Sequence, residues 1–302
     1  MADGKVRIFD IERFAIKDGP GIRTVVFMSG CPLHCPWCSN PESGSQSARL
    51  MHVRNRCLRC GACAGVCSKG AVSAAGDGLP SFDRKACDVC GACKDICPGG
   101  AIRIVPREED CRSIIDIILR DKDYYDNSGG GVTFSGGEAM LQRDALLQML
   151  KSCREQGVGT ALETCGNVPQ ETVRAVMPYV DLFLFDLKHI DPLQMREVTG
   201  GDMGLILSNL EMIASSASAK IRLRIPCIPG FNFEKSFFED VFRLAKRLGT
   251  CGIDLLPYHE LGRGKYDQLG LEYGFHGGSA DIGLIREFAS EGIAMGLDIK
   301  VF

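Results

Sequence analysis

Short apolar segments rich in β-branched residues recur along the chain and alternate with longer amphipathic segments. The apolar segments predict seven strands, at residues 24–28, 132–135, 159–163, 181–185, 221–226, 253–256 and 298–301. Apolar residues at helical spacing predict helices at residues 139–155, 170–177, 233–248 and 281–295. Because strands that alternate with helices usually pair in parallel, we expect an α/β fold built on a parallel sheet or barrel.

The stretch between the first and second predicted strands interrupts this alternation. It contains two similar runs, CLRCGACAGVC and CDVCGACKDIC, which are offset by 30 residues. Two copies are too few for a repeat solenoid, so we interpret them as the halves of one small module inserted in a surface loop. The predicted organisation is a main domain formed by residues 1–52 and 107–302, with residues 53–106 as the insert.

Cysteine is the unusual feature of the composition, with 16 residues in a chain of 302. Hydrophobic residues at 45% and charged residues at 24% are ordinary for a soluble globular protein. The net charge of −3 gives no reason to expect nucleic acid binding, and no apolar run is long enough to cross a membrane. The N-terminus lacks the features of a secretory signal, so we expect a cytoplasmic protein whose closely spaced cysteines bind metal.

The eight cysteines of the insert have the spacing of bacterial ferredoxins, in which the fourth cysteine of each run serves the other cluster. This spacing predicts two 4Fe-4S clusters, one bound by Cys57, Cys60, Cys63 and Cys97 and the other by Cys87, Cys90, Cys93 and Cys67. A pair of structural zinc sites is the alternative, because such sites also use CxxC pairs.

The insert is basic, with 8 Lys and Arg against 4 Asp and Glu, whereas the rest of the chain carries a formal charge of −7. A basic module could dock an acidic electron donor such as a flavodoxin. However, an oxidised cluster with four thiolates carries roughly −2, so two clusters would nearly cancel the excess. The charge count alone therefore does not decide between a docking surface and simple compensation.

A separate group, GCPLHCPWCSNP at residues 30–41, has only three cysteines. Cys31, Cys35 and Cys38 could hold three irons of a 4Fe-4S cluster and leave the fourth iron open to a small molecule. S-adenosylmethionine fits such a vacancy, because its amino and carboxylate groups can chelate the open iron. This group therefore predicts a catalytic cluster.

Polar motifs follow the predicted strands where each of them ends. They are SGGE at residues 135–138, ETCG at residues 163–166, DLK at residues 186–188 and PYHELG at residues 257–262, with Arg224 inside the fifth strand. In a β/α barrel the C-terminal ends of the strands share one face. We therefore expect these motifs to converge on one site together with the cysteine triplet.

The cysteine triplet, with Trp37 before its last member and a later GGE, resembles the pattern of the radical S-adenosylmethionine (radical SAM) superfamily. More specifically, the chain is similar to the glycyl-radical-enzyme activating enzymes in DGPGIRT (residues 18–24), SGGGVTFSGGEAMLQ (128–142), FDLK (185–188) and LLPYHELG (255–262). The resemblance implies a partial (β/α)6 TIM-like barrel with an inserted bacterial ferredoxin-like domain, and three 4Fe-4S clusters in total. It also implies an enzyme that reductively cleaves S-adenosylmethionine to a 5′-deoxyadenosyl radical, which takes a hydrogen atom from a glycine of a partner glycyl radical enzyme.

The resemblance further implies roles for individual residues. Cys31, Cys35, Cys38, Lys188 and His259 would act in catalysis. Those that would bind S-adenosylmethionine are Trp37, Cys38, Ser39, Gly136, Gly137, Glu138, Asp186, Leu187, Lys188 and His259. Asp18 and Arg23 would receive the glycine loop of the partner. A monovalent cation would be held by Glu163, Thr164 and Asp186, where relatives have Asp in place of Glu163. A flavodoxin or ferredoxin-type protein would supply electrons, and we expect a monomer that binds neither nucleic acid nor a membrane.

Two alternative functions fit parts of the sequence. An electron-transfer protein of the ferredoxin type would need only the insert, but the motifs at the strand ends argue against it. A radical SAM enzyme could instead modify a peptide or a small molecule, although DGPGIRT is not expected there. The other cysteines match no ligand spacing and are expected to be small buried residues: Cys111, Cys153, Cys165, Cys227 and Cys251.

Overall fold

A long mixed sheet organises the computed structural model, which describes residues 4–74, 76, 78–216 and 220–302. Residues 1–3 of the first predicted segment and residues 75 and 77 of the predicted insert thus lie outside the described residues. Within these ranges, nine strands pair in the order β13-β12-β11-β10-β9-β8-β2-β1-β7. Their bounds are β1 (Lys5–Ala15), β2 (Arg23–Met28), β7 (Arg107–Asp110), β8 (Gly131–Gly136), β9 (Thr160–Thr164), β10 (Leu182–Asp186), β11 (Lys220–Cys227), β12 (Gly252–Pro257) and β13 (Ile299–Val301).

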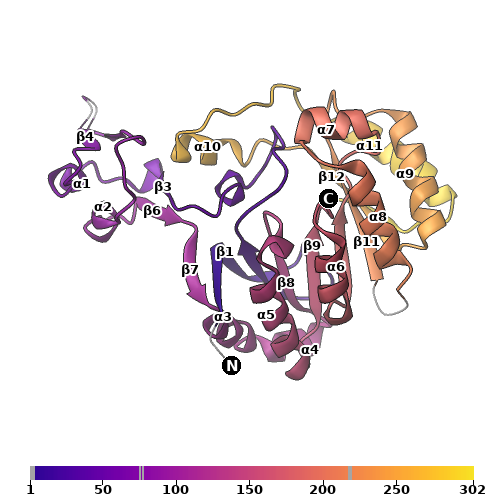
Figure 1. The fold of residues 1–302 in the computed structure, drawn as a ribbon. Helices are drawn as coiled ribbons and strands as arrows, with labels where there is room; N and C mark the ends of the chain where they lie inside the picture. The colour runs from indigo at the N-terminus through magenta and orange to yellow at the C-terminus, as the bar shows by residue number, and fades with distance from the viewer. Residues whose placement is uncertain (1–3, 75, 77, 217–219) are drawn as a thin grey trace.

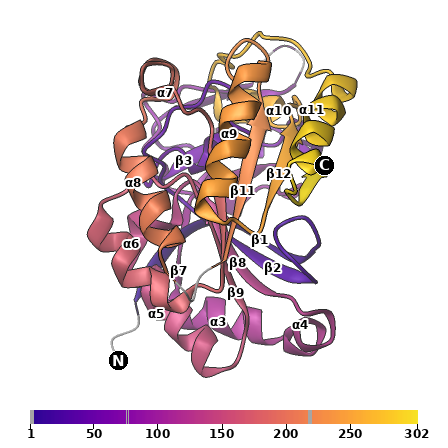
Figure 2. The same ribbon diagram turned by 90° about the vertical axis from the view of Figure 1, so that its right-hand side faces the viewer.

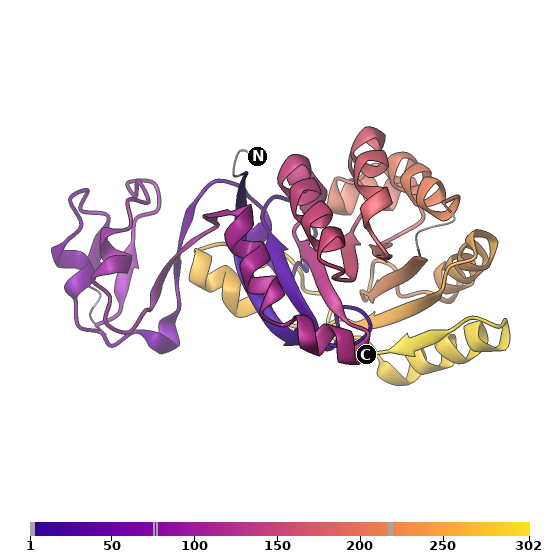
Figure 3. The same ribbon diagram turned by 90° about the horizontal axis from the view of Figure 1, so that it is seen from below.

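The seven predicted strands correspond to β2 and β8 to β13, and all the pairings among these seven are parallel, whereas β2 pairs antiparallel with β1 on its other side. The prediction of an α/β fold with a mostly parallel central sheet is therefore confirmed. The sheet is open and strongly curved, as the view along it shows (Figure 3). Its core contains large, fully buried side chains such as Phe134, Phe183 and Phe242.

Helices cover one face of the parallel strands, with α5, α6, α8 and α9 side by side (Figure 2). The α-helices of this main domain are α3 (Cys111–Leu119), α4 (Lys122–Ser128), α5 (Arg143–Glu155), α6 (Gln170–Val176), α7 (Pro192–Thr199), α8 (Met203–Ala214), α9 (Lys235–Leu248), α10 (Arg263–Leu269) and α11 (Ile282–Ala294). Short 3-10 helices are η1 (Pro41–Ser43), η3 (Ala139–Gln142) and η4 (Met177–Tyr179). The helix predicted at residues 139–155 therefore begins later, at Arg143, because its first four residues form η3. No helix among the described residues is long and apolar enough to cross a membrane.

Two antiparallel strands at one edge of the sheet, β1 and β7, were not predicted from the sequence. In β1 the alternation of buried and charged residues is regular only at the start, where Val6 and Ile8 are buried. Strand β7 has the sequence REED and offers no apolar signal. It is held instead by its ladder with β1 and by ion pairs such as Lys5–Asp110 at 2.8 Å. A charged edge strand of this kind discourages pairing with other chains.

The segment predicted as an insert lies at one end of the molecule, beside the sheet (Figures 1 and 3). Strands β3 (Arg49–His52) and β6 (Ile102–Val105) pair antiparallel where the chain enters and leaves it. Beyond them are η2 (Arg54–Arg56), α1 (Ala62–Gly65), β4 (Val72–Ala74), β5 (Pro80–Phe82) and α2 (Ala92–Asp95). Helix α10 packs against β3 through Leu269, and Arg84 donates hydrogen bonds to the carbonyls of Leu50 and Gln268. The segment is thus joined to the main domain by side-chain contacts as well as by its two connections.

Candidate functional site

A cleft of about 810 Å³ opens where the parallel strands end. It brings together residues from every predicted motif, with these contributions: Asp18 before β2; Cys31, Cys35, Trp37, Cys38 and Ser39 after it; Gly136 and Gly137 at β8; Glu163 and Thr164 at β9; Asp186 and Lys188 at β10; Arg224 in β11; His259 after β12. The expected convergence at the C-terminal ends of the strands is therefore what the fold produces.

The loop with the three cysteines is held by contacts from both sides of the cleft. The N–H of His34 donates to the carbonyl of Thr199 at 2.9 Å, and the hydroxyl of Tyr266 donates to the carbonyl of Cys38 at 3.1 Å. The N–H of Asn40 also points at the sulfur of Cys38, at 3.4 Å. These contacts fix the loop backbone and leave the three thiols facing the cleft.

Burial disfavours the thiolate form of the three cysteines when no cation is near. It raises the pKa of Cys31 to about 12 and the pKa of Cys35 to about 11, and it also raises the pKa of Cys38. If these thiols held an iron cluster, its positive charge would favour their thiolate form, because metal ligation requires the thiolate. A set of three thiols on one short loop is the donor chemistry that an iron–sulfur cluster needs.

Trp37 anchors this loop in an aromatic cluster while one side of it lines the cleft. Its ring lies 4.6 Å from the ring of Phe231 and 5.9 Å from that of Phe275, between centroids. The side chain is only 7% exposed. Trp37 therefore offers a flat, largely apolar surface to the cleft.

The two glycines of SGGE allow the β8 end to approach the cysteine loop closely. A Cβ atom at Gly137 would lie 2.2 Å from the carbonyl oxygen of Gly30 and 3.2 Å from the Cβ of Cys31. Gly136 has φ +113° and would place a Cβ 2.2 Å from the carbonyl oxygen of Met28. Only glycine fits at either position, so the backbone itself lines the cleft beside the cysteines.

Glu138 and Leu187, two residues expected to bind S-adenosylmethionine, do not line the cleft. Glu138 is fully buried and accepts hydrogen bonds from the hydroxyl of Thr164 at 2.7 Å and the N–H of Cys165 at 3.0 Å. Burial raises its pKa above the ordinary value. Leu187 is 1% exposed and belongs to the main core. Glu138 thus links the end of β8 to the end of β9 by hydrogen bonds beneath the cleft. Leu187 packs in the hydrophobic core.

Three carboxylates and two cations form the charged floor of the cleft, each 13–23% exposed. Nη1 of Arg224 lies 2.8 Å from Glu163 and 3.9 Å from Asp18, and its Nε lies 4.0 Å from Asp186. Lys188 approaches Asp186 from the other side, at 3.2 Å. The formal charge of this set is −1. Sequence reasoning noted Arg224 in its strand but gave it no role, and an arginine within an otherwise apolar strand was the available signal.

The charges of the floor stabilise one another. Burial lowers the pKa of Arg224, but Glu163, Asp186 and Asp18 together leave the pKa of this guanidinium above its ordinary value. For Lys188, burial is likewise outweighed by Asp186 and the Cys35 thiol, so the net shift of its pKa is upward. Both cations therefore stay charged. Burial outweighs the attraction of Arg224 at Glu163, whose pKa is raised.

Glu163, Thr164 and Asp186, the residues expected to hold a monovalent cation, do not form an open ring of oxygen ligands. The hydroxyl of Thr164 donates to Glu138 and accepts the N–H of Gly166 at 2.9 Å. Glu163 accepts a hydrogen bond from Ser135 and faces Arg224. The guanidinium thus supplies the positive charge between these carboxylates, and this donor set does not fit a bound cation.

The remaining predicted residues lie in different surroundings. Asp18 reaches the cleft, but Arg23 is 3% exposed and donates to the hydroxyl of Thr133 at 2.7 Å and the carbonyl of Val132. Burial lowers the pKa of Arg23 to about 10. Arg23 therefore braces the loop that carries Asp18, because Thr133 in turn donates to the carbonyl of Asp18. His259 is exposed at the cleft edge, beside the segment where Gly262 touches Ser39.

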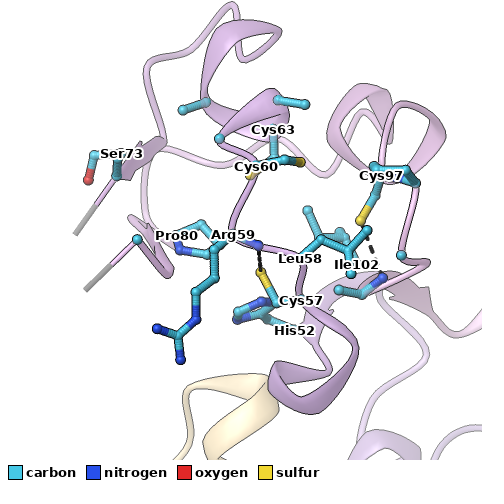
Figure 4. A pocket seen from close by; sticks show the side chains of 18 residues that line it. His52, Cys57, Leu58, Arg59, Cys60, Cys63, Ser73, Pro80, Cys97 and Ile102 are labelled. Carbon is cyan, nitrogen blue, oxygen red and sulfur yellow. Dashed lines mark hydrogen bonds between the residues drawn. The ribbon is translucent and has the colours of Figure 1, made fainter. Parts of the chain in front are cut away.

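Two further cavities lie in the segment of residues 53–106, and each is lined by four cysteines. The first has Cys57, Cys60, Cys63 and Cys97 (Figure 4), and the second has Cys67, Cys87, Cys90 and Cys93. In each cavity three cysteines come from one run and the fourth from the other run. Backbone N–H groups point at two sulfurs of the first set, from Arg59 to Cys57 at 3.4 Å and from Ala101 to Cys97 at 3.3 Å. Among the described residues, no three His, Cys, Asp or Glu side chains gather as ligands of a single metal ion.

The five cysteines without ligand spacing differ in exposure. Cys111, Cys153, Cys165 and Cys227 are buried, as expected. Cys251 is exposed, so the expectation of burial was wrong for this residue, which follows the helix end at Gly249. Cys165 also reaches the cleft wall and donates weakly to Glu138 at 3.3 Å.

The chain is similar to known proteins in sequence and in fold. The family model described as the radical SAM superfamily matches residues 25–244. The choline trimethylamine-lyase activating enzyme of Oleidesulfovibrio alaskensis is 40% identical to the chain, over 93% of this chain and 92% of that protein. The trans-4-hydroxy-L-proline dehydratase activating enzyme of Clostridioides difficile is 39% identical, with 88% of each chain covered. A radical SAM methyltransferase from Sphaerobacter thermophilus has a similar fold, with a TM-score of 0.54 over 93% of this chain and 66% of that chain at 13% identity.

Proposed function

The chain belongs to the radical SAM superfamily and, within it, to the activating enzymes of glycyl radical enzymes, and on this premise we propose how it acts. It binds S-adenosylmethionine in the cleft and uses it to remove a hydrogen atom from a glycine of a partner enzyme, which then stores the radical. The observation that supports this most directly is the gathering of three thiols, a glycine-lined wall and the charged floor in one cleft.

Cys31, Cys35 and Cys38 are the proposed ligands of the catalytic 4Fe-4S cluster. When bound, the cluster supplies one electron that splits S-adenosylmethionine into methionine and a 5′-deoxyadenosyl radical. The chain holds the cluster on a loop whose backbone is fixed from outside, by Tyr266 and the carbonyl of Thr199. A rigid loop keeps the reacting groups aligned, which is the main requirement for a directed radical reaction.

The charge of the cleft suits S-adenosylmethionine. Its sulfonium, amino and carboxylate groups leave the molecule with one net positive charge, and the floor of the cleft carries a formal −1. Lys188 offers an ammonium to the carboxylate, while Gly136 and Gly137 allow close approach of the methionyl group. Trp37, Ser39 and His259 would line the remainder of the pocket. We assign supporting roles to Glu138 and Leu187, which position the walls from beneath.

Asp18 is the proposed contact for the glycine loop of the partner. It lies at the cleft on a loop that Arg23 and Thr133 brace from beneath. Arg224, at 3.9 Å, orients the Asp18 carboxylate toward the same space. This arrangement would let a peptide loop enter the cleft beside Asp18, and the seated loop would then exclude water from the reacting groups.

Residues 53–106 are the proposed ferredoxin-like module with two further 4Fe-4S clusters. The support is that each cavity groups the four cysteines assigned to one cluster by spacing. These clusters would pass electrons from a flavodoxin or ferredoxin-type donor to the catalytic cluster. We further propose that the chain acts in the cytoplasm, because a reducing compartment keeps the cysteine thiols available to the clusters. We also propose that it is a monomer.

Electron paramagnetic resonance tests the function. The reconstituted, reduced protein is mixed with S-adenosylmethionine and candidate glycyl radical enzymes under anaerobic conditions. We expect an organic radical on one partner, whose spectrum changes when its glycine is labelled with deuterium, together with release of 5′-deoxyadenosine. Release of 5′-deoxyadenosine without a radical on any partner would instead favour modification of a peptide or small molecule.

The control variant is Cys35→Ser, which removes one of the three cleft thiols. We expect neither 5′-deoxyadenosine nor the radical with this variant. The matched change Cys153→Ser alters a buried cysteine that belongs to none of the proposed groups of cluster ligands. It should leave both products present.

A further inference from the structure

His52 is a buried polar side chain in the wall of the first four-cysteine cavity. It lies in β3, opposite Ile102 of β6, and is 5% exposed. It lines this cavity together with Cys57 (Figure 4). Its Nε2 is fully buried and has no hydrogen-bond partner among the described residues. A buried imidazole nitrogen without a partner loses free energy relative to water, so such a group calls for an explanation.

The repeat within the insert makes this position informative. His52 precedes Cys57 by five residues, and Phe82 precedes Cys87 by the same number. The two rings also touch, with centroids 5.2 Å apart. Each copy therefore has a ring at the same position, but only the first copy has a nitrogen in it.

The second cavity contrasts with the first in its wall. Its described lining has no histidine and includes the apolar side chains of Leu50, Val72 and Ile104. The two sets of four cysteines are alike in spacing, so the walls are where the two sites differ. A difference in the wall changes the reduction potential of a cluster, because the wall sets the hydrogen bonds to the sulfurs and the exposure to solvent while the ligands stay the same.

We propose that Nε2–H of His52 donates a hydrogen bond to a sulfur atom of the cluster held by Cys57, Cys60, Cys63 and Cys97, and that this cluster is therefore easier to reduce than its neighbour. The proposal rests on the proposed function, which assigns clusters to both cavities. Reduction adds one electron from the external donor to the cluster, and no proton moves at His52. A hydrogen bond to sulfur strengthens as the cluster becomes more negative, so it favours the reduced state.

The imidazole has the properties that this role requires. The imidazole ring carries at least one N–H in every protonation state, so it can donate a hydrogen bond. The pairing of β3 with β6 holds the backbone of His52 at the cavity wall.

Only the difference in the strength of this hydrogen bond between the two oxidation states affects the reduction potential. We expect that difference to shift the reduction equilibrium of this one cluster about tenfold. For a one-electron couple this corresponds to about 59 mV.

Potentiometric titration of the full-length reconstituted protein, followed by electron paramagnetic resonance, tests the proposal. The variant His52→Phe gives both copies the same ring and should lower the potential of one cluster by about 59 mV. His52→Gln keeps an N–H donor and should recover most of the shift. His276→Phe makes the same chemical change at an exposed histidine and should leave all potentials unchanged. Full-length protein with Cys31, Cys35 and Cys38 changed to Ala assigns the shifted signal to the insert.

Iron analysis separates the possible failures. Wild-type protein with about 12 iron atoms per chain but no shift in His52→Phe would refute the role of His52 and leave the proposed clusters intact. Loss of one cluster in both His52 variants would also refute it, because His52 would then be a ligand or essential for assembly. Wild-type protein with about 4 iron atoms per chain would overturn the assignment of clusters to the insert, and with it this inference.

Discussion

Replacing Arg224 by Met removes the guanidinium that lies between the three carboxylates of the cleft floor. The closest of them, Glu163, loses an ion pair at 2.8 Å and, among the described residues, keeps the hydrogen bond from Ser135. Asp186 retains Lys188 at 3.2 Å, so the main loss falls on Glu163. Breaking a buried pair by removing one partner costs about 3–5 kcal/mol, because the remaining charge has no compensation. We expect the lower end, about 3 kcal/mol, because both side chains keep some exposure.

Urea unfolding of the reconstituted protein, followed by far-ultraviolet circular dichroism and by the fluorescence of Trp37, measures this loss. Trp37 is the single tryptophan of the chain and lies at the cleft. With a slope of about 3 kcal/mol per molar urea, the midpoint should fall by about 1 M. The double variant with Glu163→Gln should recover most of the stability. Arg247→Met breaks an exposed ion pair with Glu211 and should cost less than about 1 kcal/mol.

The pH dependence has a definite sign. Because burial raises the pKa of Glu163, the folded state binds a proton that the unfolded state has released, and stability falls as pH rises between the two pKa values. Removing Arg224 raises the pKa of Glu163 in the folded state further, because the attraction of the guanidinium is lost. The pH range over which stability falls therefore extends to higher pH. The deficit of Arg224→Met should therefore be smaller at pH 5.5 than at pH 8. An equal deficit at both pH values, or no recovery in the double variant, would refute the charge balance described for the cleft floor.

Three more predictions concern the function of the cleft and the insert. Gly137→Ala places a Cβ 2.2 Å from the carbonyl of Gly30 and should weaken S-adenosylmethionine binding at least about tenfold by calorimetry, whereas Gly264→Ala, with nothing within 4 Å of its Cβ, should not. Exchanging Na⁺ for K⁺ or for an organic cation at constant ionic strength should leave the yield of 5′-deoxyadenosine unchanged, because Arg224 already supplies the charge beside Glu163; a requirement for one ion would contradict this. Cys57→Ala or Cys87→Ala should slow radical formation with a flavodoxin donor but spare it with a small chemical reductant, and equal loss with both donors would mean that the insert clusters are structural.

The cysteine runs and the alternation of strands and helices are local features, and both could be predicted from the sequence. The spacing of the cysteines within residues 57–97 assigned four of them to each cavity. In two-cluster ferredoxins each cluster takes three cysteines from one run and the fourth cysteine of the other run, and this rule can be applied to the sequence alone. The parallel strands were identified because they are short apolar runs, and several of them, such as β2, β8 and β9, are buried on both faces. Strand β7 was missed because its stability comes from the neighbouring strand and from ion pairs, which carry no period along the chain. Strand β1 was missed because its buried residues alternate regularly only at its start.

The motifs at the strand ends located the cleft, but their sequence did not say which side chains face it. Glu138 and Gly137 are adjacent in the chain, yet one is fully buried under the β8 end and the other lines the cleft. Arg224 and Glu163 are 61 positions apart and pair because β10 lies between β9 and β11 in a curved sheet. Local patterns thus determined which groups the chain possesses and roughly where the strands end. Only the tertiary structure decided which charges meet, which nitrogen at His52 lacks a partner among the described residues, and which residues brace the site from behind, because those depend on contacts between segments distant in sequence.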